Sequence, residues 1–279
     1  LAPPFVIPGL TAGGADEFGR PDASLYTYVD TSRTLAAGMM GQLVPLLDAT
    51  QYADAGDPNA FMVENETDGY HPQFVHGSIF GVTGSTIGPL YSDSSTAVTR
   101  DLGNGHSEND LRPEFRKFAE PMRWFGTTES RVPGYVAAIR AEHGADAERI
   151  LIEGAPHVMI FPNLFIAEIQ VFNIQPVSVN ECTQYSTAVQ LAGAPELNRR
   201  MVSQCVGSVG PAGMLLADDT EMYERNQQGL AALTPEWLDV RRGIHRETVD
   251  ENGHPVGTAT DETGMRGFWS HYKNLMETP

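Results

Sequence analysis

The sequence predicts an α+β domain in which helices gather on one side of an antiparallel sheet. Residues 157–176 carry the strongest strand signal, because they are rich in β-branched and aromatic side chains. The stretch is interrupted at Pro162-Asn163, where a kink or reversal of the strand is expected. Residues 218–233 have the pattern of a clear helix. Strands followed by helices in this way are typical of α+β proteins.

The elements before these strands are less sharply defined. Residues 1–30 are rich in Pro, Gly and Asp, which predicts an irregular lead-in. In residues 32–50 apolar side chains recur at helical spacing, but Pro45 argues against an unbroken helix. A helix is expected to start near Phe61 and to carry the candidate metal ligands described below. The stretch 78–112 is rich in Gly, Ser and Thr, and that composition suits strands and loops.

The remaining elements complete the pattern. Residues 113–148 look helical, with a break at Pro133-Gly134 and a further short helix from Ala137. Residues 186–191 are expected to continue the sheet. The tail, residues 241–279, is expected to be loop followed by a short C-terminal helix.

Composition limits the class of function. The chain has 36 acidic and 18 basic residues and a formal net charge of −18, so it should repel the phosphate backbone of nucleic acids. No apolar run approaches the roughly 20 residues needed to cross a bilayer, and the first residues lack the features of a signal peptide. The two cysteines, Cys182 and Cys205, are too few for a secreted disulfide scaffold. We therefore expect a soluble, cytoplasmic protein that binds neither nucleic acid nor membrane.

Two histidines five residues apart, His71 and His76, are the first candidates for a metal site. Residues at this spacing do not stack on an ideal helix, where positions four apart align. Pro72 directly follows His71 and should break the local helix, because it lacks an amide donor. A broken turn would let both imidazoles converge on one ion. The alternative is that one histidine is buried and hydrogen-bonded while the other faces solvent.

A third ligand is available at Asp219. Asp218 and Glu221 have the spacing of a capping box, so Asp218 would cap a helix and leave Asp219 free to point elsewhere. Two imidazoles and one carboxylate form the three-ligand face that holds non-heme ferrous iron and leaves positions open for dioxygen and substrate. In the alternative, both aspartates only complement the helix dipole. Asp68 could orient the ring of His71, or it could be an ordinary solvated aspartate before a glycine turn.

Residues 64–76 (ENETDGYHPQFVH) resemble the catalytic-domain signature of the large (α) subunit of Rieske non-heme iron aromatic-ring hydroxylating oxygenases. The resemblance continues in the family's order over roughly residues 57–277. Its further segments are residues 103–106 (GNGH), 160–164 (IFPNL), 210–213 (GPAG) with 217–219 (ADD), and 266–269 (RGFW). Each segment alone is weak, but the ordered set is specific.

The resemblance implies a helix-grip (START-like) fold and a role for each matched residue. His71, His76 and Asp219 would bind a mononuclear Fe(II). Asp68 would link an iron-ligating histidine to the Rieske cluster of a neighbouring subunit, and Asn65 would lie near the iron. The positions expected to line the substrate pocket, with ordinary core packing as the alternative, are Gly69, Pro72, Asn163, Phe165, Val209 and Leu215.

The reaction implied by the resemblance is cis-dihydroxylation of an aromatic substrate by dioxygen. The C-terminal portion most resembles the benzoate-like branch, so a compact aromatic acid is the expected substrate class. Electrons would come from NADH through a reductase or ferredoxin and then a Rieske [2Fe–2S] cluster. The family is often trimeric in its α subunits, sometimes with a β subunit. The alternatives are a Rieske-type monooxygenase performing oxidative demethylation, and a helix-grip ligand-binding module with no redox role.

The sequence departs from the family in two respects. Asn59-Ala60-Phe61-Met62 stands where Asn-Trp-Lys is usual. The Cys-x-His and Cys-x-x-His motifs that hold the Rieske cluster do not occur in these 279 residues. We therefore divide the chain into residues 1–56, an unassigned lead-in, and residues 57–279, the mononuclear-iron catalytic domain. Either the chain is a fragment that has lost its Rieske domain, or a separate protein supplies the electrons. On its own, the chain is not expected to turn over.

Overall fold

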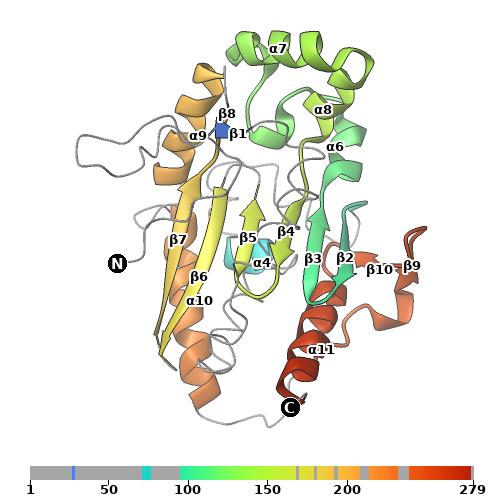
Figure 1. Cartoon of the computed structure of the whole chain (residues 1–279), viewed down its shortest axis with the longest axis vertical. Helices are drawn as coiled ribbons and strands as arrows, with labels where there is room; N and C mark the ends of the chain where they lie inside the picture. The colour runs from blue at the N-terminus through green and yellow to red at the C-terminus, as the bar shows by residue number, and fades with distance from the viewer. Residues whose placement is uncertain are drawn as a thin grey trace.

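An antiparallel sheet of eight strands forms the centre of the molecule (Figure 1). The computed structural model describes residues 27–28, 71–76, 95–167, 170–178, 181–191, 194–207, 214–231 and 239–277. The strands lie in the order β7-β6-β5-β4-β3-β2-β10-β9, so most neighbours in space are also neighbours in sequence. Their bounds are β2 (Val98–Gly103), β3 (His106–Asp110), β4 (His157–Ile160), β5 (Leu164–Ala167), β6 (Gln170–Ser178), β7 (Glu181–Ala188), β9 (Thr248–Val249) and β10 (Pro255–Thr258). A separate parallel pair joins β1 (Thr27–Tyr28) to β8 (Gln190–Leu191).

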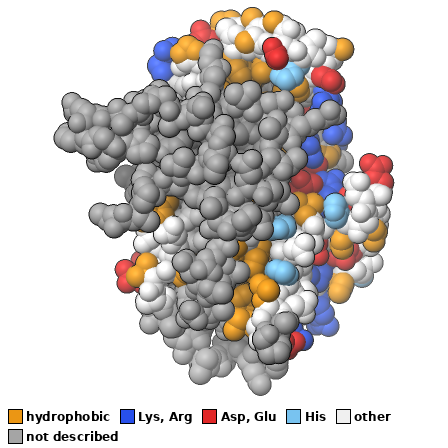
Figure 2. Space-filling model, viewed as in Figure 1, with side chains coloured by type: hydrophobic (Ala, Val, Ile, Leu, Met, Phe, Trp, Pro, Cys, Tyr) orange, Lys and Arg blue, Asp and Glu red, His pale blue; other side chains and the backbone are white. Residues whose placement is uncertain are grey.

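Seven α-helices are described besides short 3-10 turns. They are α4 (His71–Val75), α6 (Arg112–Phe118), α7 (Pro133–His143), α8 (Ala147–Glu153), α9 (Pro195–Gly207), α10 (Met214–Ala231) and α11 (Thr263–Glu277). Helices α6, α7 and α8 gather at the end of the sheet opposite to α11 (Figure 1). On the solvent side of α7, apolar and charged side chains are mixed (Figure 2).

Two of these helices cover the same face of the sheet. The strand register places four side chains in one row across the sheet, and these are Ser107, Met159, Phe165 and Phe172. Helix α11 packs on this face so closely that a Cβ atom on Gly264 would lie 2.9 Å from Cβ of Ser107. Helix α9 lies on it too, because the amide of Gln170 donates to Sγ of Cys205 at 3.0 Å. The predicted α+β class, with helices packed on an antiparallel sheet, is confirmed.

The core consists of two apolar clusters. The smaller one joins the sheet to α11 through Met159, Phe161, Ile174 and Phe268. The larger one fills the end of the sheet under α6, α7, α8 and α9, with Trp124 and Phe125 among its buried aromatic residues. The indole nitrogen of Trp124 donates to the carbonyl oxygen of Leu151 at 3.0 Å, so the polar atom of this buried ring is satisfied.

Several predicted elements differ from the structure. Helix α7 begins at Pro133, where the sequence predicted a break, because proline is well tolerated in the first turn of a helix. Helix α9 was not predicted. The tail predicted as loop contains β9 and β10, and β10 joins the main sheet by pairing with β2. The predicted helix start near Phe61, the pattern in residues 32–50 and most of the lead-in lie outside the described residues.

Candidate metal centre

The two candidate histidines lie at opposite ends of the short helix α4. His71 is its first residue, and His76 follows its last, with the amide of His76 donating to the carbonyl oxygen of Pro72 at 3.2 Å. Pro72 therefore occupies the first turn, where its missing amide leaves no helical hydrogen bond unmade. The helix break expected at Pro72 is not found, because α4 continues through this residue. The rings approach edge to face, with their centroids 4.9 Å apart and their Nε2 atoms 3.1 Å apart.

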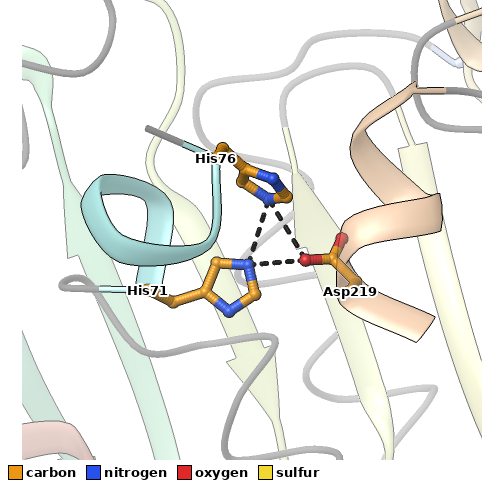
Figure 3. A group of neighbouring side chains, drawn as sticks. All are labelled: His71, His76 and Asp219. Atoms are coloured by element: carbon orange, nitrogen blue, oxygen red, sulfur yellow. Dashed lines mark hydrogen bonds and ion pairs between the residues drawn. The ribbon is translucent and has the colours of Figure 1, made fainter. Parts of the chain in front are cut away.

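Asp219 on α10 supplies the third member of the group. Its Oδ1 atom lies 2.8 Å from Nε2 of His71 and 3.1 Å from Nε2 of His76. Figure 3 shows the three side chains pointing toward one common point between α4 and α10. All three residues are buried, with exposed fractions of 9% for His71, 7% for His76 and 5% for Asp219. Among the described residues, this is the one group of three His, Cys, Asp or Glu side chains whose spacing suits a metal ion.

The carboxyl of Asp219 is held in its charged form. Burial by itself raises the pKa of this carboxyl, but hydrogen bonds and charge attraction from His71 and His76 outweigh burial and leave the pKa below its ordinary value. A deprotonated carboxylate is the form that binds cations. The site thus offers two imidazole nitrogens and one anionic oxygen, with bulk water kept away.

The spacing of the three atoms fits one face of an octahedral ligand shell. The triangle has sides of 2.8, 3.1 and 3.1 Å. With metal–ligand bonds of about 2.1 Å, neighbouring ligand atoms lie about 3.0 Å apart in an octahedron and about 3.4 Å apart in a tetrahedron. Hydrogen bonds alone explain the triangle less well. If both Nε2 atoms carried protons to donate to Asp219, the two N–H groups would repel each other across the 3.1 Å between the rings. Two histidines and a carboxylate on one octahedral face suit ferrous iron with open positions.

Three of the predicted pocket positions are well defined in the fold. Asn163 is buried in the turn between β4 and β5, and its amide nitrogen donates to the carbonyl oxygen of Ile174 at 2.8 Å. Phe165 is buried and stacks on Phe172, with ring centroids 5.8 Å apart. Leu215 is half-buried in the first turn of α10. Their role in lining a pocket stays a prediction.

The other predicted positions divide into two groups. Pro72 is half-buried and lies beside His71 in α4. Asp68, Asn65, Gly69 and Val209 lie outside the described residues.

The prediction that Asp218 caps a helix is wrong. Helix α10 begins at Met214, so Asp218 lies inside the helix and does not cap it. Its Oδ2 atom instead lies 3.8 Å from Nδ1 of His76. The run Met214-Leu215-Leu216-Ala217 consists of strong helix formers, and this was the available signal that the helix starts earlier.

A known protein family matches most of the chain. Residues 61–278 match the family described as ring hydroxylating alpha subunit (catalytic domain). No curated protein matches the chain. In the part of the chain that the structure describes, no helix is long and apolar enough to cross a membrane.

Three similar solved structures are naphthalene 1,2-dioxygenases. A variant bound to phenanthrene has 20% identity and a TM-score of 0.57, and the match covers 80% of this chain and 53% of that one. A structure with indole bound in the active site has 19% identity, a TM-score of 0.57 and the same two coverages. The enzyme from Rhodococcus sp. bound to indole has 17% identity and a TM-score of 0.58, with 94% of this chain and 64% of that chain covered.

At these identities the solved structures show a shared fold, and the chain spans between half and two thirds of their length. The family match, by contrast, covers most of the chain. This chain belongs to the ring hydroxylating alpha subunit (catalytic domain) family.

Proposed function

We propose that residues 57–279 are the catalytic domain of an aromatic-ring hydroxylating dioxygenase, and that His71, His76 and Asp219 hold a mononuclear Fe(II). The observation that carries this proposal is the convergence of three buried ligand atoms within 3.1 Å of one another. Family membership supports it, because this family implies non-heme iron. Iron bound here would supply the activation of dioxygen, which protein side chains cannot provide.

The side chains would hold the ion and keep the site dry. Two neutral imidazoles and one carboxylate offset a single charge of a divalent cation, so the bound site keeps a net positive charge that favours electron-rich ligands. The burial of all three residues excludes bulk water, which strengthens electrostatic interactions inside the site. Helices α4 and α10 carry His71 and Asp219, and ligands on regular elements are placed more accurately than ligands on loops.

The proposed reaction adds both atoms of dioxygen to an aromatic ring. Two C–O bonds form, the O–O bond and one ring π bond break, and two electrons and two protons enter to give the cis-dihydrodiol. The electrons would come from NADH through a reductase or ferredoxin and a Rieske [2Fe–2S] cluster, which this chain must receive from another domain or protein. Asp68 would stand on the electron path between subunits of a homotrimer, with or without a β subunit. A benzoate-like acid is the proposed substrate.

Iron uptake is the first test. The full chain is incubated with Fe(II) under argon, freed of unbound metal and analysed for iron. We expect about one iron per wild-type chain, and a loss of at least about tenfold in occupancy for His71→Ala and Asp219→Ala. His245→Ala is the matched control, because His245 is exposed on a surface turn. A wild-type chain that retains no iron, or variants that retain as much as wild type, would overturn the proposal.

Product analysis is the second test, and it can avoid the missing electron source. Hydrogen peroxide equals dioxygen plus two electrons and two protons, so it can convert benzoate to the cis-diol with atoms and electrons balanced. We expect mass spectrometry to detect the cis-diol with iron-loaded wild type and not with His71→Ala. Release of formaldehyde from methoxybenzoate, without any diol, would favour the demethylase alternative. Tight binding of an aromatic acid by protein that takes up no iron would favour the non-redox binding module.

A further inference from the structure

Asp218 faces the side of His76 that is turned away from the proposed metal. The Oδ2 atom of Asp218 lies 3.8 Å from Nδ1 of His76. This oxygen is shielded from solvent and has no hydrogen-bond partner among the described residues, although the Asp218 side chain as a whole is 36% exposed. A shielded carboxylate oxygen without a donor has lost its hydration and gained no hydrogen bond in exchange, which is unfavourable. A hydrogen-bond donor is therefore expected near Oδ2 of Asp218.

The chemistry of the site supplies that donor. His76 turns its Nε2 atom toward Asp219, so Nε2 is the nitrogen that would bind a metal. A neutral imidazole that binds a metal through Nε2 must carry its proton on Nδ1. This proton points toward the Asp218 carboxylate. A movement of about 1 Å brings the two atoms to hydrogen-bonding distance.

We infer that Asp218 is a positioning residue for the metal centre, and that its carboxylate accepts the Nδ1 proton of His76. The inference rests on the proposed function, because it assigns a role toward the metal that His71, His76 and Asp219 would hold. Two consecutive residues of α10 thus face the two nitrogens of the His76 ring: Asp219 lies near Nε2 and Asp218 lies near Nδ1. Such an acceptor fixes the tautomer and orientation of the ring and makes its ligating nitrogen more basic.

The test measures Co(II) binding by the full chain. Cobalt(II) accepts the same imidazole and carboxylate ligands as Fe(II), is stable in air and absorbs visible light when bound. We expect Asp218→Ala to raise the dissociation constant by about 10- to 100-fold, the usual effect of removing such an acceptor. Asp218→Asn should lose less, because its amide oxygen still accepts the proton. Asp218→Glu should recover part of the affinity.

Glu221→Gln is the matched control. It removes the same charge from the next turn of α10, where Glu221 pairs with Arg225 at 2.7 Å in solvent, and it should leave the dissociation constant within about twofold of wild type. Equal losses in Asp218→Ala, Asp218→Asn and Glu221→Gln would show that Asp218 acts only through its charge, which would overturn the inference. Wild-type affinity in Asp218→Ala would overturn it directly.

A proton spectrum of the Co(II)-loaded protein gives a readout that a purely structural role would not change. The Nδ1 protons of both metal-bound histidines appear as shifted, exchangeable signals. Asp218→Asn should move and broaden the signal of one histidine, which His76→Gln identifies, and should leave the signal of the other in place. Unchanged signals would overturn the inference.

The outcomes of Co(II) binding separate the inference from the proposed function. If wild type binds no Co(II), both the proposed function and the inference fail. If wild type binds and the Asp218 variants bind equally well, the inference alone fails.

Discussion

The Nε2 atom of His71 lies 2.8 Å from Oδ1 of Asp219, so the first residue of α4 faces the second turn of α10 inside the protein. His76, which follows α4, also approaches α10, with Asp219 at 3.1 Å and Asp218 at 3.8 Å. A metal bound between the two helices would therefore link them directly. Binding to the folded state should appear as added stability.

The first prediction concerns this linkage. At a Co(II) concentration about 100 times the dissociation constant, the free energy of unfolding of wild type should rise by about 2.7 kcal/mol. Asp219→Asn should show little of this gain, because the variant lacks the anionic ligand. Urea denaturation with and without Co(II) measures both values. Magnesium at the same concentration is the control, because Mg²⁺ prefers oxygen ligands. An equal gain in wild type and Asp219→Asn would contradict the prediction.

The central strands could be predicted from the sequence because their signal is local. Residues 157–176 combine β-branched and aromatic side chains with a reversal at Pro162-Asn163, and the structure has β4, β5 and β6 there. Strand β10 gave no such signal. It is four residues long and contains Gly257, and it becomes a strand by pairing with β2, which is distant in sequence.

Helix boundaries depended on signals that competed with one another. Asp218 and Glu221 have capping-box spacing, but the apolar run before them continues the helix back to Met214. For α9 a start signal was present, since Pro195 and Glu196 open the helix. The pairing of the histidines with Asp219 could be predicted only from family resemblance, because nothing local in either segment points to the other.

The second prediction concerns two glycines of the β2–β3 hairpin, one at the end of β2 and one in the turn that follows it. Both have positive φ, +81° at Gly103 and +77° at Gly105. A Cβ atom on Gly105 would lie 2.7 Å from Cδ2 of Phe161 and 3.0 Å from Cδ2 of His271, while a Cβ atom on Gly103 would meet nothing within 4 Å. Gly103→Ala should cost about 1 kcal/mol for its backbone conformation alone.

Gly105→Ala should cost about 2–4 kcal/mol, because overpacking against buried Phe161 adds to the backbone term. The difference between the two variants isolates the contact of this turn with Phe161 and α11. Thermal and urea unfolding measure it. An equal loss of free energy of unfolding in the two variants would mean that a Cβ atom at position 105 does not overpack against Phe161.

The third prediction concerns pH and the buried imidazole of His106, the first residue of β3. Its Nδ1 atom accepts a hydrogen bond from the backbone amide of Phe161 at 3.0 Å. Burial lowers the pKa of His106, and the nearby His271 lowers it further, while Asp101 opposes both. Burial also lowers the pKa of His271, again against an opposing effect of Asp101. Both imidazoles thus favour the neutral form in the folded protein.

The direction in which the free energy of unfolding changes with pH follows from proton uptake. As pH falls below about 6.5, the unfolded chain binds protons at these histidines before the folded chain does, so the free energy of unfolding must fall. His106→Asn keeps an acceptor for the Phe161 amide but does not titrate. Its free energy of unfolding should therefore decline less steeply between about pH 7.5 and pH 5.5, by at most about 1.4 kcal/mol per pH unit. His245→Asn, at an exposed position, should keep the wild-type slope. Urea titrations across this range compare the three proteins, and a wild-type slope in His106→Asn would show that His106 takes up protons equally in the folded and unfolded states, which would contradict the prediction.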